Sequence, residues 1–328
     1  MKPAVLLFCS MLLFLILRAQ EKPVGEEMSL QSDNDNFALH IKDGYYTNGF
    51  FFRYNYLPRQ YRKRGILEKI TSYYCLGQEI YTSESIHNNY IWEIDRPFTA
   101  HLFLEKGFRF FLRTGAVAKV SLSAGVTGKA ALGQTVQDTY HSLLGLVHSN
   151  GWYYELNSAA AINMDLSWFS PIMKTTAEKP DLMISFQLRG GTAFTDVTTG
   201  MFLRLGKKNH PSASSYYDAR IGVIEPGKEI FFYFYPRLRY QFFNATVQGG
   251  AFIKDKGFFT ASLHPWQWIQ EAGVQVARAR WTFQAALTVQ EKEARSMRKN
   301  VWFGTLGLKY RCGDHRAKEK NKNNYTRR

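Results

Sequence analysis

Hydrophobic and polar residues alternate over several long segments of the chain. The clearest segment covers residues 110–126, where Phe110 and Leu122 belong to one apolar series while Arg113 and Lys119 belong to the intervening, more polar one. Residues 182–190 and 302–311 repeat the pattern. Period-two alternation predicts β-strands with one apolar face, and these segments exceed what a strand of average length needs.

Long alternating segments that end in aromatic rings are typical of transmembrane β-barrels. Strands of this kind need about 9–11 residues to cross a bilayer, with apolar side chains outward and polar ones inward. Rings expected at the membrane interfaces occur at segment ends: Tyr54, Tyr56, Tyr73, Tyr74, Trp266, Trp268 and Trp281. The mean hydropathy of −0.30 also suits alternation better than a stack of membrane helices. The alternative is a soluble β-sandwich, whose strands also alternate.

The N-terminus predicts export from the cytoplasm. Lys2 precedes an apolar run over residues 4–17, which is followed by Arg18 and Ala19. This is the pattern of a secretory signal peptide, and the run is shorter than the roughly 20 residues of a membrane helix. We therefore expect a signal peptide at residues 1–19, one barrel domain at 20–311 and a basic, disordered tail at 312–328. At roughly 25 residues per strand and connection, the barrel has about twelve strands.

Net charge and cysteine content limit the kinds of binding partner and of cysteine site that the chain could have. The chain has 42 Lys and Arg against 27 Asp and Glu, a formal charge of +15. Export and the lack of a basic helix or an RNA-binding motif argue against nucleic acid. In an outer membrane, the polyanion at hand is the phosphorylated lipid A of lipopolysaccharide, which Lys and Arg would attract. Three cysteines do not form a disulfide-dense scaffold or a zinc motif.

Two polar clusters offer candidate chemistry near the N-terminus. Residues 32–37, SDNDNF, are dense in the oxygen ligands that Ca²⁺ prefers, although the spacing is not that of an EF-hand and a plain polar turn is the alternative. Residues 43–49, DGYYTNG, read as a turn that leads into a strand. Further on, Asp95 and Arg96 lie side by side in sequence and could form a structural ion pair.

A third cluster contains a candidate general base. In LGQTVQDTYH, residues 132–141, Gln137 and His141 are four apart and share one face of a helix or a strand. A histidine beside polar partners can act as a base near neutral pH, although a lone histidine is more often structural. The sequence has neither the GxSxG motif of serine hydrolases nor the HExxH motif of zinc proteases. For a hydrolase, water activated by histidine is therefore the simpler proposal.

Taken in order, these motifs resemble the outer-membrane lipid A 3′-O-deacylase family. The resemblance rests on NDNF at 34–37, DGYYTNG at 43–49, LGQEIYT at 76–82, DRPFTA at 95–100, LGQTVQDTYH at 132–141, GW at 151–152, GGTAFTDVTTGMFLRLG at 190–206 and VWFGTLGLKYR at 301–311. It spans nearly the whole chain after the signal peptide. It implies an all-β, twelve-stranded antiparallel barrel in the bacterial outer membrane, with a short helix in an outer loop.

The resemblance also implies an activity and its residues. Family members remove the 3′ acyloxyacyl group of lipid A in a Ca²⁺-dependent reaction. By position, His141 matches the catalytic histidine and Gln137 its partner, Thr47 matches a threonine, and Asn34 and Asp35 match an Asn-Asp pair that would also serve the metal. We expect lipid A or lipopolysaccharide as substrate and a monomer in the outer membrane.

The sequence departs from the family pattern after the histidine. Family members carry an acidic residue there, whereas residues 143–147 are apolar in this chain. Glu155 or Asp138 could take its place. The rival hypothesis is therefore a non-catalytic barrel, such as a channel or structural protein, that kept the scaffold without the acid.

Overall fold

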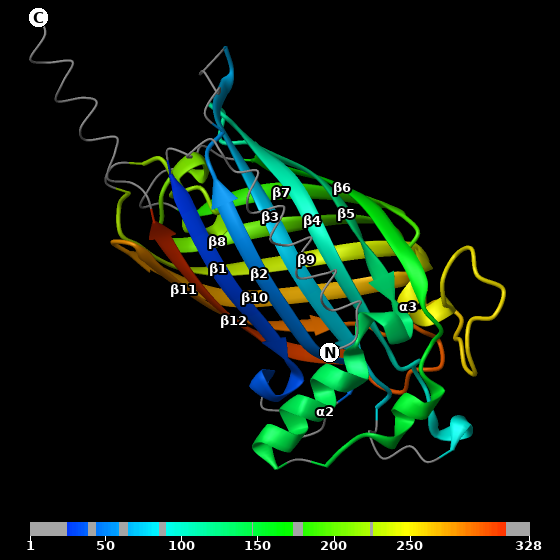
Figure 1. Cartoon of the computed structure of the whole chain (residues 1–328). Helices are drawn as coiled ribbons and strands as arrows, with labels where there is room; N and C mark the ends of the chain where they lie inside the picture. The colour runs from blue at the N-terminus through cyan, green and yellow to red at the C-terminus, as the bar shows by residue number, and fades with distance from the viewer. Residues whose placement is uncertain are drawn as a thin grey trace, which may run out of the picture.

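Twelve antiparallel strands close into one barrel, in the computed structural model that describes residues 25–38, 44–58, 65–84, 90–145, 147–172, 180–223 and 226–312 (Figure 1). The strands are β1 (Glu26–Asn34), β2 (Tyr46–Tyr56), β3 (Leu67–Tyr81), β4 (Thr99–Leu112), β5 (Val117–Thr127), β6 (Ala159–Pro171), β7 (Asp181–Gly191), β8 (Phe194–Lys207), β9 (Glu229–Asn244), β10 (Trp266–Arg278), β11 (Trp281–Gln290) and β12 (Val301–Cys312). Each strand pairs with its neighbours in sequence, and β1 pairs with β12, so the sheet has no free edge. The predicted barrel and its strand number are confirmed.

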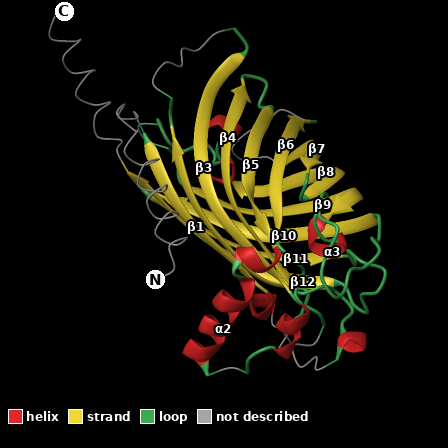
Figure 2. Ribbon diagram, turned by 45° about the vertical axis from the view of Figure 1, so that its right-hand side comes forward, coloured by secondary structure: helices red, strands yellow, loops and turns green. Residues whose placement is uncertain are grey.

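Both α-helices and most of the 3-10 helices lie at one end of the barrel, which we call the loop end (Figure 2). They are α2 (Gly133–Leu144), α3 (Ala245–Gln248) and the 3-10 helices η1 (Asp35–Ala38), η2 (Ile91–Glu93), η3 (Gly128–Ala131) and η4 (Asn150–Tyr154). The opposite end, which we call the turn end, carries η5 (Pro211–Ala213) and η6 (Ser215–Tyr217) between β8 and β9. Within the described residues, no helix is long and apolar enough to cross a membrane.

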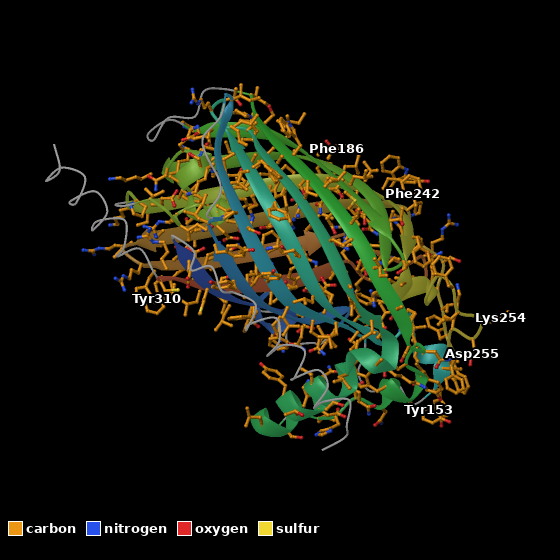
Figure 3. All side chains as sticks on the ribbon, turned by 45° about the horizontal axis from the view of Figure 1, so that its top comes forward. Tyr153, Phe186, Phe242, Lys254, Asp255 and Tyr310 are labelled. Carbon is orange, nitrogen blue, oxygen red and sulfur yellow. The ribbon has the colours of Figure 1, made fainter. Side chains whose placement is uncertain are left out.

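Successive side chains on each strand alternate between the outer and the inner face of the barrel wall. On β7, Ile184 and Phe186 are exposed on the outer face, whereas Met183 and Ser185 are buried inside. On β12, Leu306 is exposed outside, and Lys309 is buried inside. Apolar side chains such as Phe186 and Phe242 project from the wall in Figure 3. This is the arrangement of a barrel whose outer face meets lipid.

Two details differ from the sequence prediction. Residues 110–126 are not one strand but the end of β4, a tight turn at 113–116 and most of β5. Gly115 supplies the positive φ of +87° that this turn requires. Because the four-residue turn preserves the parity of the side chains, the alternation runs through it unbroken. Tyr73 was expected at a membrane interface, but it points inward and is only 1% exposed.

The predicted domain boundaries are partly outside the described residues. The signal peptide predicted at 1–19 and residues 313–328 of the predicted tail fall there. The last strand reaches Cys312, one residue beyond the predicted end of the barrel. Cys75 and Cys312 are free cysteines, and Cys75 is buried.

The turn end of the barrel is closed by residues 208–223. Inward-facing Lys69 donates hydrogen bonds to the carbonyls of Ala219 and Ile221, both at 2.5 Å. Asp218 forms ion pairs with Lys309 and, at 2.7 Å, with Arg109. These contacts come from three strands of the wall and hold the segment inside the barrel.

Candidate functional site

The predicted site residues near the N-terminus lie on the outer face of the barrel at the loop end. Asn34 continues the outward series of β1, yet it is only 2% exposed because the loops cover it. Its Nδ2 donates to Oδ1 of Asn48 on β2 at 2.6 Å. Its own Oδ1 accepts from the backbone N–H of Asn36 at 2.8 Å, which starts η1.

Asp35 and Thr47 are buried in the same region. The carboxylate of Asp35 accepts a hydrogen bond from the backbone N–H of Gly44 at 2.8 Å, which fixes the far end of the first loop. Thr47 lies at a bulge in the β2–β3 pairing, and its hydroxyl contacts that of Thr82 at 2.7 Å. The bulge turns Thr47 out of the regular register, as bulges next to functional sites do.

Helix α2 carries the other two predicted residues. Gln137 is fully buried, and its Oε1 accepts a hydrogen bond from Nε1 of Trp152 at 2.6 Å. Its Nε2 has no hydrogen-bond partner among the described residues. Gly133, at the start of the helix, faces Ala100 and Trp152 so closely that an added Cβ would come within 2.6 Å and 2.7 Å of them. The helix is therefore packed tightly against β4 and η4.

The imidazole of His141 is held by the backbone. Its Nδ1 lies 2.5 Å from the carbonyl oxygen of Val147, and the side chain is almost fully buried. A carbonyl can only accept, so Nδ1 carries the proton of this hydrogen bond, and in the neutral imidazole the lone pair is on Nε2. The apolar stretch at 143–147, which lacks the family's acidic residue, thus orients the histidine through a main-chain group.

Neither acidic residue considered as a replacement is placed in that role by its described contacts. Asp138 lies 3.4 Å from Nδ1 of His148 in an ion pair. Glu155 lines a separate cavity beside the first turn of α2.

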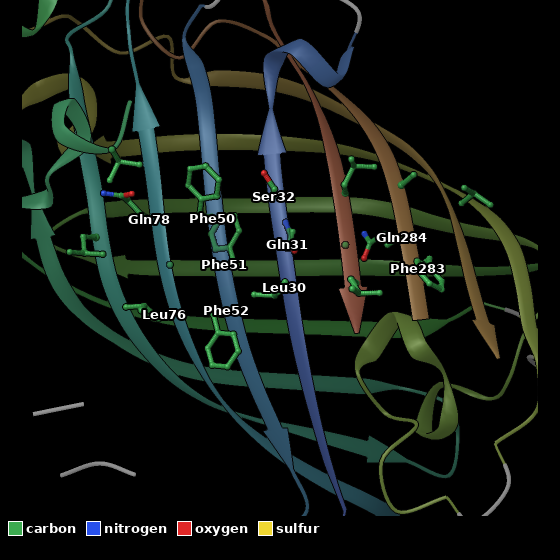
Figure 4. A pocket seen from close by; sticks show the side chains of 18 of the residues that line it. Leu30, Gln31, Ser32, Phe50, Phe51, Phe52, Leu76, Gln78, Phe283 and Gln284 are labelled. Carbon is green, nitrogen blue, oxygen red and sulfur yellow. The ribbon is translucent and has the colours of Figure 1, made fainter. Parts of the chain in front are cut away.

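An apolar groove runs over the outer wall between the two groups of site residues. It has a volume of about 960 Å³ and extends from β10 across β12 and β1 to β4 and α2. Ser32 and Phe50 line it close to Asn34 and Asn48, and Leu132 and Val136 of α2 line its other side. Figure 4 shows Phe50, Phe52 and Leu76 on neighbouring strands of its wall.

The loops above the site are locked together by buried polar contacts. The hydroxyl of Tyr45 donates to Asp95 at 2.6 Å, and Ser83 donates to the other oxygen of Asp95 at 2.6 Å. Arg96 pairs with Glu293 at 2.7 Å. The ion pair considered between Asp95 and Arg96 is therefore wrong, since each of the two side chains bonds to other partners.

The residues predicted to hold a metal ion supply oxygen ligands of the right kind. Asn34 offers an amide oxygen and Asp35 a carboxylate, and each oxygen that accepts one N–H retains a second lone pair. Among the described residues, no three His, Cys, Asp or Glu side chains come together as a ready-made metal site. A hard cation needs six to eight oxygens, so most would have to come from elsewhere.

Sequence reasoning missed three partners in this site. Asn48, Thr82 and the indole of Trp152 each bond to a predicted residue. The motifs DGYYTNG, LGQEIYT and GW contain all three, but only the pairing of the strands and the packing of η4 on α2 show which side chain each one meets.

Comparison with known proteins identifies the family. The model of the family described as "Outer membrane protein LpxR" matches residues 6–312. The solved structure of LpxR from Salmonella typhimurium aligns with a TM-score of 0.71 at 16% identity, covering 87% of this chain and 99% of that one. The translocator domain of the autotransporter NalP from Neisseria meningitidis aligns with a TM-score of 0.47 at 9% identity, covering 94% and 95%. No curated protein sequence matches.

The match over residues 6–312 covers far more than half of the chain, and the barrel agrees with that of the Salmonella protein. The family also fixes the location of the barrel in the bacterial outer membrane. This chain is a member of the LpxR family of outer-membrane lipid A deacylases.

Proposed function

We propose that the protein hydrolyses the ester-linked 3′ acyl chain of lipid A at the outer leaflet, with His141 as the base that activates water. The observation that carries this proposal is the hydrogen bond from Nδ1 of His141 to the Val147 carbonyl, which leaves Nε2 as a proton acceptor. In outer-membrane barrels the longer loops face the exterior, so α2 would meet the outer leaflet.

In the reaction, Nε2 of His141 takes a proton from water as the water oxygen attacks the ester carbonyl. The tetrahedral intermediate then collapses, the ester C–O bond breaks, and the protonated histidine returns the proton to the leaving sugar oxygen. General acid–base catalysis of this kind contributes about 10²–10⁴-fold to rate. Gln137 and Trp152 act as positioning residues, because their hydrogen bond ties α2 to η4.

Asn34, Asp35 and Thr47 would form the opposite side of the site. Asn34 and Asp35 would hold a Ca²⁺ ion through their side-chain oxygens, with the remaining ligands drawn from main-chain groups, water or the substrate. Such an ion would polarise the ester carbonyl. The Thr47 hydroxyl would donate a hydrogen bond to the substrate.

The outer-wall groove would receive the acyl chains. It opens on the lipid-facing side of the wall and leads to α2, so a lipid could enter from the membrane without leaving its apolar surroundings.

The test is a mass spectrum of lipid A from bacteria that carry fully acylated lipid A and express this protein. We expect loss of the 3′ acyloxyacyl group with the wild type, and an unchanged spectrum with His141→Ala or after chelation of Ca²⁺. Near-normal turnover by a folded His141→Ala barrel would contradict the mechanism. Activity that survives chelation would contradict only the proposed role of Ca²⁺.

The rival function is a channel on the same scaffold. The position of residues 208–223 argues against a channel, because Lys69, Arg109 and Lys309 hold this segment inside the barrel. We expect no steady ion conductance in planar bilayers. A well-resolved open state in a preparation without deacylase activity would favour the channel.

A further inference from the structure

A second cavity lies at the loop end beside the first turn of α2, where Leu132 lines both this cavity and the lipid-facing groove. Its volume is about 430 Å³, within the range of roughly 300–1,000 Å³ for small-molecule sites. Three separate loop segments line it, and the residues used below are Lys129, Gln134, Trp152, Tyr153, Glu155 and Phe258. Of these six residues, only Trp152 also takes part in the site proposed for ester hydrolysis, through its indole N–H.

The first unusual feature is the carboxyl group of Glu155. This residue is only 4% exposed, and its Oε1 has no hydrogen-bond partner among the described residues. Burial raises the pKa of Glu155 to about 8, against the opposing effect of Lys129. An unpaired carboxyl group is costly to bury, so a purely structural role would favour a glutamine or an apolar residue here.

The second feature is a pair of exposed aromatic rings at the cavity mouth. Tyr153 is 71% exposed and Phe258 is 58% exposed, and their rings stack with centroids 5.7 Å apart. Figure 3 shows Tyr153 at the same corner as Lys254 and Asp255, and the loop that carries them is joined to the chain after η4 by a bond from Asn157 to the Asp255 carbonyl at 3.2 Å. Large rings left in water at a cavity mouth indicate a binding surface.

The third feature is the polarity of the rest of the lining. Lys129 is an exposed cation, and Gln134 offers an amide donor and acceptor. An acyl chain would leave these groups and the Glu155 carboxyl unpaired. A metal ion would meet one carboxyl beside a lysine, which is a poor set of ligands.

We propose that this cavity binds a sugar ring of an anionic saccharide. The C–H face of a pyranose would stack on Tyr153, whose ring face is negative, while its hydroxyls bond to Glu155 and Gln134. A phosphate or carboxylate on the sugar would pair with Lys129. That this saccharide belongs to lipopolysaccharide rests on the proposed function. In lipopolysaccharide, a core saccharide continues from lipid A toward the water side, where this cavity opens.

The binding test uses the full barrel in detergent micelles, with His141→Ala to prevent turnover. The probe is core oligosaccharide released from lipopolysaccharide, measured by isothermal titration calorimetry. We expect Tyr153→Ala and Glu155→Leu each to weaken binding about tenfold, since the first removes the stacking surface and the second a hydrogen-bonding partner of the sugar. Glu155→Gln, which keeps a donor and an acceptor, should retain binding.

Three further variants keep the test independent of folding defects. Lys129→Ala alters an exposed side chain and should weaken binding, whereas Lys254→Ala should not. Trp92→Ala is the matched aromatic control, because Trp92 is 74% exposed and stacks on Tyr90 but does not line the cavity. Equal weakening by Trp92→Ala and Tyr153→Ala, or no binding by a folded barrel, would overturn the proposal.

An activity test separates this proposal from the proposed function. With active protein, Tyr153→Ala should slow turnover of core-bearing lipopolysaccharide and leave turnover of core-free lipid A unchanged. Deacylation without any saccharide binding would overturn the cavity proposal alone. Saccharide binding by a barrel that deacylates neither substrate would overturn the proposed function alone.

Discussion

The two ends of the barrel differ in how the buried carboxyl groups of Asp218 and Glu155 are surrounded. At the turn end, the carboxylate of Asp218 lies between Lys309 and Arg109, and Lys69 donates to main-chain carbonyls of the same segment. Burial alone would raise the pKa of Asp218, but the two cations overcome it and lower that pKa. These groups are neutralised by partners, which is how a fold stabilises buried charge.

At the loop end, key polar atoms lack such partners. Oε1 of Glu155 and Nε2 of Gln137 are buried without a hydrogen bond among the described residues. The turn end also has buried polar atoms without a hydrogen bond among the described residues, including the carboxyl of Glu27, Nδ2 of Asn55 and the amide of Gln275. None of these three groups lines a cavity described above, whereas Glu155 does. A polar group kept unpaired beside a cavity costs stability and suits a ligand, so the comparison indicates that one end holds the barrel closed and the other end binds.

The largest expected effect is on activity at the loop end. His141→Ala should lower the rate of lipid A deacylation by at least about 100-fold, because the general base is lost. The barrel should remain folded, since α2 lies outside the wall. Quantitative mass spectrometry of lipid A measures the rate, and heat-modifiable migration on gels reports folding. If Asp218→Asn lowers the rate per folded molecule equally, the division between the two ends is wrong.

The next effect concerns stability at the turn end. Asp218→Asn should lower the free energy of unfolding by about 3–5 kcal/mol, because Arg109 and Lys309 would be left buried without their anion. Urea titration followed by tryptophan fluorescence measures it. Lys299→Ala is the matched control at the loop end, since its ion pair with Glu84 is exposed and is worth at most about 1 kcal/mol. A similar loss in both variants would contradict the comparison.

The third prediction is a pH dependence that comes from Glu155. Its pKa rises from an ordinary 4.5 to about 8 in the folded protein, so its stabilising contribution is complete below pH 4.5 and is lost as pH rises through 8. Glu155→Gln should remove this dependence, which amounts to at most about 1.4 kcal/mol per pH unit. Unfolding midpoints of the two proteins between pH 5 and 9 measure the difference. Parallel curves would show that the carboxyl is paired or hydrated.

The smallest effect is expected from Trp152→Phe. It removes the donor to Gln137, which costs about 1 kcal/mol and loosens α2 against η4. We expect roughly a fivefold loss of deacylation, with KM changing less than kcat, because the histidine becomes less well oriented. Tyr154→Phe, which keeps the ring in the neighbouring position, should leave both values unchanged.

The sequence by itself determined the barrel. Alternation over 182–190 and 302–311 correctly assigned which side chains face lipid and which face inward, because a strand exposes successive residues on opposite faces. The four-residue spacing of Gln137 and His141 correctly placed them on one helix face. The same parity concealed the turn at 113–116, since a hairpin of four residues does not interrupt it.

Only the tertiary structure decided which groups meet. Asp95 bonds to Tyr45 rather than to its neighbour Arg96, and the Val147 carbonyl, not an acidic side chain, accepts the hydrogen bond from Nδ1 of His141. The unpaired carboxyl of Glu155 could likewise be identified only from the structure, because three separate loop segments form the cavity that it lines. Periodicity records the local geometry of a strand or helix, whereas these contacts join segments that are distant in sequence and depend on how the loops pack.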